Sequence, residues 1–308
     1  MKTQNKVEMK VCGALIKRNV TMFFKDKGTF FTSLATPMIL LVLYATFLSN
    51  VYEDSFRAVL PAAIPVADSQ INGLVGGLLL SSLLAVSAVT VPFCANLFMV
   101  QDRVTGARAD LSIAPMKSSS LALGYYLATV LNGLIICFVA LALGLGYLAI
   151  VGWYLSATDI LLLMLDVVIL VLFGTALSSL ICYPLNSQGA ISAVGSIVSS
   201  CYGFLCGAYM PISSFSKGLR NALVFLPGTH GTSLLRNHAL SGVFDAMSAD
   251  NIPQEAVDAL RSVADCKLSF FGGDIDKWVM YLVLVGSVVL LVAAYVLITV
   301  LAERKNRK

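Results

Sequence analysis

The residues of this chain that could do chemistry are few and widely spaced. The two histidines, His230 and His238, stand eight residues apart in a polar connection, where such side chains are expected to be solvated or capping groups. No HExxH pair, CxxC pair, GxxxxGK[ST] loop or GxSxG turn occurs, so the usual zinc, redox, ATP-binding and serine-hydrolase patterns are absent. The sequence therefore predicts no catalytic residue, no metal site and no cofactor bound by this chain.

The composition indicates a membrane protein. Of the 308 residues, 58% are hydrophobic and only 12% are charged, which is about half the charged share of a soluble domain. Six apolar runs are long enough to cross a hydrocarbon core, which takes about 20 helical residues, and lipid leaves helices as the only structure for isolated runs. We place the runs at Phe30–Leu48, Leu74–Val100, Leu121–Leu148, Ile160–Tyr183, Ala190–Tyr209 and Trp278–Leu301.

Lysine and arginine are distributed unevenly between the connections. Residues 1–28 hold seven of them, residues 101–120 hold three, and the tail after Leu301 holds four, whereas Arg57 is alone between the first two runs. Short loops rich in these residues stay on the cytoplasmic side of a membrane. We therefore predict a multi-pass protein of the cell membrane with both termini in the cytoplasm.

This orientation divides the chain into three parts. Residues 1–28 form a cytoplasmic N-terminus, residues 29–302 the transmembrane domain, and residues 303–308 a cytoplasmic tail. Within the transmembrane domain, residues 101–120 are a cytoplasmic loop and residues 211–276 an extracellular one. The first apolar run continues as a full span, so no cleavable signal peptide is expected.

Amphipathic segments flank the runs. Residues 7–25 place Val11 and Leu15 one turn apart and Lys17 on the polar side, which is typical of a helix lying flat at the membrane interface; a simple positive anchor is the alternative. In the outer loop, "DNIPQEAVDALRSVADC" predicts a short helix with Asn251 as its N-cap. The expected fold is an all-α membrane protein: six transmembrane helices, an N-terminal interfacial helix, and a small external helical cap between helices 5 and 6.

Two polar side chains lie inside apolar runs. Asp166 is the only acidic residue well within a run, and an aspartate at a helix centre costs roughly 2.5–3.5 kcal/mol. It lies about six residues from the outer end of its run, roughly 9 Å deep and within reach of water. Asn132 lies nearer the midplane. Each could line a substrate path or bond a neighbouring helix.

Small residues recur along the fifth run at spacings of four, three, four and four. This spacing would put them on one helix face, where they permit close helix packing or line a path that opens and closes; both interpretations stay open. The residues are Ser192, Ser196, Ser199, Gly203 and Gly207. Near the outer end of the same run, Cys206 could pair with Cys266 of the outer loop, or both thiols could stay free.

The loop "QDRVTGARADLSIAPMKSSS", residues 101–120, separates two long stretches that carry no charge. It holds five charged residues together with a glycine and a proline. A passive cytoplasmic link would need the basic residues but not Asp102 and Asp110. The excess favours a surface on which a soluble partner docks.

Three stretches, in order along nearly the whole chain, resemble the membrane subunits of ABC-2 type exporters. A basic helix runs into a first span with a proline, "LIKRNVTMFFKDKGTFFTSLATPMILLVLYATF". A charged cluster precedes a Gly-Tyr in the third span, "QDRVTGARADLSIAPMKSSSLALGYYLA". The third stretch follows the fifth span, "GFLCGAYMPISSFSKGLRNALVFLPGTHGTSLLRNHALSG".

This resemblance implies a permease subunit of an ATP-driven exporter, without enzymatic activity of its own. Two such subunits, identical or different, would form a twelve-helix unit, and each would engage a separate cytoplasmic ATPase that binds ATP and Mg. The loop 101–116 would be the coupling segment that docks on the ATPase, with Gln101 where the family often has an acidic residue. By the resemblance, the docking residues are Asp102, Arg103, Gly106, Asp110, Leu111 and Pro115.

The exporter would move a drug-like, lipid or peptide substrate through a path between its helices in the lipid membrane. The alternative is a channel, or a structural membrane subunit of another complex that is not driven by ATP. A secondary transporter is disfavoured because neither internal repeats nor broken helices are evident. A nucleic-acid partner is disfavoured because no basic patch with interleaved aromatic residues occurs.

Overall fold

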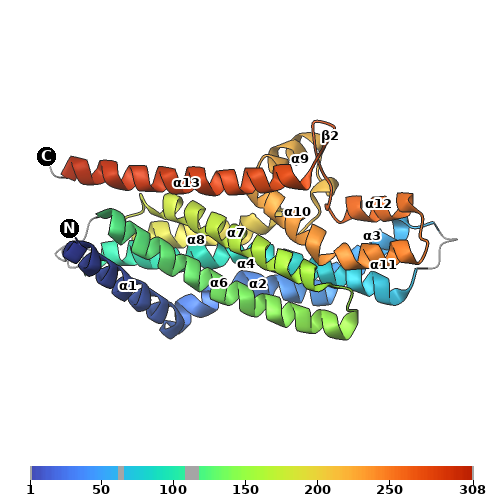
Figure 1. Ribbon diagram of the computed structural model, residues 1–308, viewed down its shortest axis with the longest axis horizontal. Helices are drawn as coiled ribbons and strands as arrows, with labels where there is room; N and C mark the ends of the chain where they lie inside the picture. Colours follow the sequence, from blue (N-terminus) through green and yellow to red (C-terminus); the bar gives the residue numbers. More distant parts are fainter. Residues whose placement is uncertain (1, 62–65, 108–117, 307–308) are drawn as a thin grey trace.

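A computed structural model describes residues 2–61, 66–107 and 118–306 of the chain. Long helices lie side by side in an elongated bundle, and α1 begins at the same end at which α13 ends (Figure 1). The first membrane helix continues from α2 through a π-helical turn, η1 (Tyr44–Leu48), into α3 (Ser49–Val59). The long helices are α1 (Lys2–Lys25), α2 (Lys27–Leu43), α4 (Asp68–Val104), α6 (Ser118–Val151), α7 (Ala157–Cys182), α8 (Gln188–Leu205) and α13 (Lys277–Asn306).

Among the described residues, five helices are long and apolar enough to cross a membrane, judged by length and composition. They are Lys27–Val59, Asp68–Val104, Ser119–Val151, Ala157–Cys182 and Lys277–Leu301, and they coincide with five of the six runs. The remaining run corresponds to α8, which has 18 residues and carries four serines and Gln188. Its mean hydropathy is too low for a membrane span because of these polar residues, so the sixth span stays a prediction.

Helix α4 forms the centre of the bundle. It packs against α2, α6, α7, α8 and α10, and 94% of the residues in its most apolar stretch are buried. A helix that is apolar on every side belongs in such a position. The corresponding stretch of α13 is only 17% buried, so α13 presents most of its apolar side chains to the surroundings.

The connection between α8 and α13 is only in part the predicted cap. Its middle helix, α10, turns back into the bundle and packs against α4, α7 and α13, which the sequence interpretation missed. The short helix predicted around residues 254–263 is present, but its N-cap is Pro253 and Asn251 has a left-handed backbone with φ 58°. The elements are η2 (Ile212–Ser214), α9 (Lys217–Val224), α10 (Pro227–Ala239), α11 (Ser241–Ala249), α12 (Gln254–Val263), β1 (Leu268–Phe270) and β2 (Gly273–Ile275).

Strands β1 and β2 form an antiparallel hairpin in which Leu268 pairs with Ile275. The hairpin was not predicted, but the other described elements are helices, so the predicted all-α class is confirmed. The hairpin lies immediately before α13 (Figure 1).

Candidate functional site

A groove of about 1300 Å³ lies between α2, α3, α4 and α8. It extends from Asp26, before α2, to Ser55 in α3 and Ser214 in η2. From Asp26 to Ser55 the chain takes 29 steps (55 minus 26), which advance about 43 Å along the axis of α2 and α3, and this matches a bilayer with its head-group layers. The groove therefore extends over about the full thickness of a bilayer.

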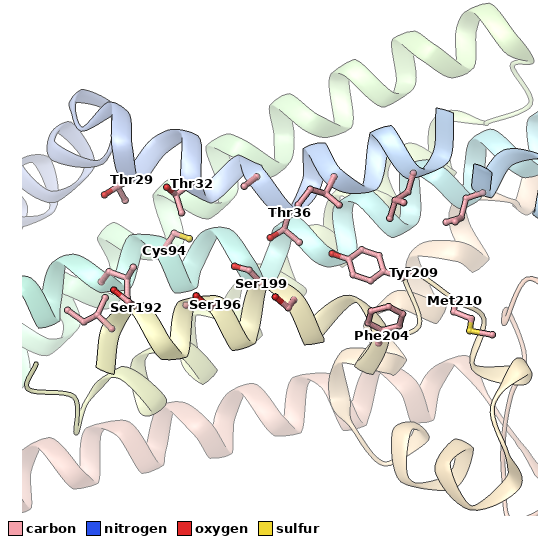
Figure 2. A pocket seen from close by; sticks show the side chains of 18 of the residues that line it. Thr29, Thr32, Thr36, Cys94, Ser192, Ser196, Ser199, Phe204, Tyr209 and Met210 are labelled. Carbon is pink, nitrogen blue, oxygen red and sulfur yellow. The ribbon is translucent and has the colours of Figure 1, made fainter. Parts of the chain in front are cut away.

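Hydroxyl groups face one another across one half of this groove. Figure 2 shows three threonines of α2 on one side and three serines of α8 on the other, with Cys94 of α4 between the two walls. The threonines repeat at spacings of three and four residues and therefore share one helix face. The facing residues are Thr29, Thr32 and Thr36, and Ser192, Ser196 and Ser199.

Asp26 is the only charged residue among the described residues that line the groove. Its Oδ2 accepts a 2.8 Å hydrogen bond from the Thr29 hydroxyl, and its Oδ1 accepts bonds from the backbone N–H groups of Gly28 and Thr29. These bonds, the Thr29 hydroxyl first, lower the pKa of Asp26 below its ordinary value. Asp26 is thus an ionised N-cap at one mouth of the groove.

The predicted small-residue stripe divides into two groups. Ser192, Ser196 and Ser199 line the groove, whereas Gly203 faces the ring of Tyr209, only 2.3 Å from where a Cβ would stand. Gly207 lies beyond the last residue of α8 and has φ +77°, a backbone conformation that favours glycine. The expectation that all five share one helix face is wrong at Gly207, because the helix ends first.

Asp166 and Asn132 do not line the groove. The Asp166 carboxylate is buried and lies 2.6 Å from Nδ1 of His238 in α10, and it accepts a 2.6 Å bond from the Tyr281 hydroxyl in α13. Of the two roles left open for Asp166, these contacts favour a bond to neighbouring helices. Asn132 is also buried, and its Oδ1 has no hydrogen-bond partner among the described residues.

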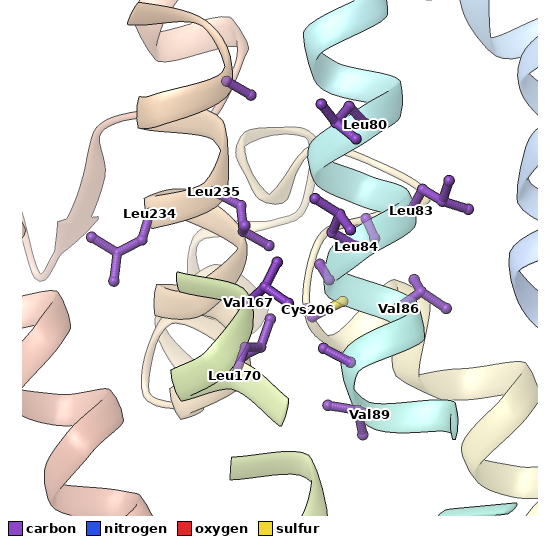
Figure 3. Packing of buried hydrophobic residues seen from close by; sticks show 14 of the residues in the cluster. Leu80, Leu83, Leu84, Val86, Val89, Val167, Leu170, Cys206, Leu234 and Leu235 are labelled. Atoms are coloured by element: carbon purple, nitrogen blue, oxygen red, sulfur yellow. The ribbon is translucent and has the colours of Figure 1, made fainter. Parts of the chain in front are cut away.

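Both histidines are buried, with 3% and 6% of their surface exposed, so they are not solvated. Nε2 of His230 lies 2.7 Å from the carbonyl of Val224, the last residue of α9, which agrees with the capping alternative. Both histidines belong to α10, whose residues 228–239 are all buried. Figure 3 shows Leu234 and Leu235 of α10 beside Val167 and Leu170 of α7, across from α4. The close approach requires a glycine, because a Cβ on Gly231 would stand 2.4 Å from Leu170.

A buried ion pair ties α10 to the segments that follow α8 and α12. Arg236, 1% exposed, donates a 3.0 Å bond to Oδ2 of Asp265 and a 2.6 Å bond to the Gly207 carbonyl. Asp265 Oδ2 also accepts from the backbone N–H of Ile212 at 2.6 Å. Burial lowers the pKa of Arg236, but Asp265 and the nearby tyrosines and Cys266 together outweigh burial, and the pKa is raised. The pair thereby fixes the segment after Gly207, of which Pro211 and Ser214 line one end of the groove.

At the opposite end of the bundle, Asp102 binds α1 and α6. Arg18 of α1 donates two hydrogen bonds to its carboxylate, at 2.7 and 2.8 Å, and the Tyr125 hydroxyl donates a third at 2.6 Å. The bond to Asp102 raises the pKa of Arg18. Because Asp102 is only 4% exposed, it faces helices of its own chain, which corrects its predicted place on a docking surface.

Arg103, the next residue, binds the connection between α7 and α8. Its Nη1 donates to the backbone carbonyls of Tyr183 and Leu185, and its guanidinium lies 5.2 Å from the centre of the Tyr183 ring. Gly106 follows the end of α4 with φ +84° and is exposed. The other predicted docking residues, Asp110, Leu111 and Pro115, lie outside the described residues.

The partners of Asp102 and Arg103 could not be read from the sequence. Arg18 was visible as a basic residue of an amphipathic helix, and Tyr125 as part of a Gly-Tyr pair, but nothing in the chain joined either to Asp102. Cys206 and Cys266 are both buried free thiols, so the disulfide alternative is set aside. Among the described residues, no group of three or more potential ligands could hold a metal ion.

A comparison with protein families gives one match. The family model described as "ABC-2 type transporter" matches residues 10–239, which is 230 of the 308 residues. The matched range contains the groove helices, the Asp102 and Arg103 contacts, and α10. No curated protein matches the chain.

Proposed function

The chain belongs to the ABC-2 type transporter family and is a multi-pass membrane permease; from this premise we propose that it forms the substrate path of an ATP-driven exporter. The observation that carries the proposal is the groove between α2 and α8, which runs the height of a bilayer. Ser192, Ser196 and Ser200 on its α8 wall are exposed. A second permease subunit, identical or different, would cover this face and close the path.

In this proposal the ATPase is a separate cytoplasmic chain that binds ATP and Mg and docks on the connection between α4 and α6. Asp102 and Arg103 stand where that connection leaves α4, one bound to α1 and α6 and the other to the α7–α8 connection. A displacement of the docked segment would thus reach four helices at once. The two residues act as positioning residues for coupling, and contact with the ATPase falls to the segment after Gly106.

The proposed orientation puts both termini in the cytoplasm and the protein in the plasma membrane. Support comes from the basic residues near both ends of the chain and from the start of α1 and the end of α13, which lie at the same end of the bundle (Figure 1). Asp26 then marks the cytoplasmic mouth of the groove, and the α9–α12 connection lies outside with α8 as the sixth span. The substrate is a drug-like molecule, a lipid or a peptide.

The test is to purify the tagged chain gently from its native host and identify the chains that copurify with it. We expect a cytoplasmic P-loop ATPase, and we expect a variant that lacks residues 107–116 to lose it while still inserting in the membrane. This deletion spares Asp102 and Arg103, whose internal contacts the bundle needs. A matched control replaces residues 107–116 by a flexible linker of equal length.

Two outcomes would overturn the proposal. One is recovery of the chain without any ATPase, with the deletion variant behaving like the parent. The other is ion conductance by the purified chain in a planar bilayer without ATP, which would point to the channel alternative.

A further inference from the structure

The groove changes character along its length. Its first half carries the facing threonines and serines (Figure 2). The next part of its α2–α3 wall is apolar, with side chains four residues apart on one helix face; these residues, called the apolar belt below, are Ile39, Leu43, Phe47 and Val51. The belt spans 12 steps along the helix (51 minus 39), or about 18 Å. Polar groups return beyond it at Ser55 and Ser214.

The charge pattern argues for an uncharged occupant. In the part of the chain that the structure describes, Asp26 is the only charged residue lining the groove, and hydrogen bonds from the start of its own helix occupy both of its carboxylate oxygens. Lys25 and Lys27 flank it in the chain, so the mouth offers no net negative charge to a cation. A charged group deep in the groove would be desolvated without a partner, which is strongly unfavourable.

The far end of the groove is a second polar place for a head group. Ser55 and Ser214 line it, and Ser214 is exposed, so its hydroxyl is open to a ligand. Tyr52 also lines this end, but it is 2% exposed and its hydroxyl oxygen is buried, so that hydroxyl does not reach the groove.

We propose that the groove binds a single-chain amphiphile whose head group is uncharged and rich in hydrogen-bonding groups, such as glycerol or a sugar. The head occupies the threonine and serine half before transport and the Ser214 end after it, while the chain lies on the apolar belt in both orientations. This inference rests on the proposed function, because it assigns the substrate class of the same groove.

The test uses the chain in lipid nanodiscs without an ATPase, so that binding is measured separately from coupling. The probe is a monoacylglycerol with a photoreactive diazirine on its glycerol head, and mass spectrometry maps the labelled peptides. We expect label near Thr32 and Ser196 and again near Ser214, with little on the belt. Analogues with the same chain and a phosphate or trimethylammonium head should compete at least roughly tenfold less well than unlabelled monoacylglycerol.

Matched variants sharpen the assignment. Thr36→Val keeps the side-chain shape and should weaken labelling of the threonine and serine half, whereas Ala193→Ser, on α8 but outside the groove lining, should not. Ser214→Ala should weaken labelling at the outer end only. Ser213→Ala is its control, because Ser213 is the neighbouring exposed serine but does not line the groove.

Three results would overturn the inference: label concentrated on the belt, equal competition by the charged analogues, or label spread over α6 and α13 as bulk lipid would give. A chain that binds the probe as expected but never copurifies with an ATPase would instead contradict the proposed function while leaving the substrate class intact.

Discussion

Helices α8 and α10 are both short and both carry several polar residues, yet they lie in opposite environments. Helix α10 includes Arg236, His230 and His238 and is buried from residue 228 to residue 239. Helix α8 has no charged residue, and much of its surface is exposed along the groove. The difference shows that polar side chains can be buried where the fold supplies hydrogen-bond partners. The polar groups of α10 meet Asp265, Asp166 and backbone carbonyls at hydrogen-bond distance.

The largest loss of stability is expected when one partner of the buried ion pair is removed. Arg236→Met should destabilise the protein by about 3–5 kcal/mol, because it leaves the Asp265 carboxylate buried and uncompensated. Thermal unfolding in mild detergent measures the effect. Lys267→Met, which removes the exposed pair with Asp258, is the control and should change stability by less than about 1 kcal/mol. Equal effects of the two substitutions would contradict the assigned role of Arg236.

The same substitution in the two environments gives the next largest effect. Ser178→Val should destabilise by about 2–4 kcal/mol, because Ser178 is fully buried, and the change overpacks the core and removes the 2.8 Å bond from Asn96. Ser196→Val, on the exposed wall of the groove, should change stability by less than about 0.5 kcal/mol but reduce probe binding. A melting temperature that falls as much for Ser196→Val as for Ser178→Val would show that the groove wall is packed core.

Loss of the Arg18–Asp102 pair, which holds α1 to the end of α4, should lower stability less but should clearly reduce coupling to the ATPase. Asp102→Asn weakens the bonds from Arg18, which is 34% exposed at its side chain, so we expect about 1–2 kcal/mol. In the complex with its ATPase, substrate-stimulated ATP hydrolysis should fall although the ATPase still copurifies. The charge exchange Arg18→Asp with Asp102→Arg should restore part of it. If substrate stimulates ATP hydrolysis equally in the Asp102→Asn variant and the parent, Asp102 has no role in coupling.

The smallest effect is a difference in thiol reactivity at neutral pH. Burial raises the pKa of the Cys266 thiol to about 12, so at pH 7 roughly one molecule in 10⁵ carries the reactive thiolate. Cys201, exposed on α8, should be alkylated by N-ethylmaleimide in the folded protein, and Cys266 only after unfolding. Peptide mapping by mass spectrometry distinguishes the two sites, and fast labelling of Cys266 would show that the outer connection opens.

The membrane helices were predictable because their signal is local. A run of about 20 apolar residues identifies a span whatever its neighbours are, and five runs correspond to helices that can cross a membrane. The burial of α10 was not predictable, because "THGTSLLRNHALSG" is typical of a polar loop. Its partners Asp265 and Asp166 belong to other parts of the chain. One wall of the groove could be predicted, because the spacing of the serines in α8 puts them on one helix face. The opposite wall could not, because the threonines of α2 belong to a distant part of the chain.

The sequence by itself determined the class of protein, the number and approximate limits of its apolar runs, and the uneven distribution of charge that favours one orientation. These depend on composition and on the spacing of neighbouring residues, which every stretch of chain carries with it. Only the tertiary structure decided which charges are paired and which face is left open. Ion pairs such as Arg18–Asp102 and Arg236–Asp265 join residues 84 and 29 positions apart, and the free energy of burying a charge depends on the partner that the fold brings to it.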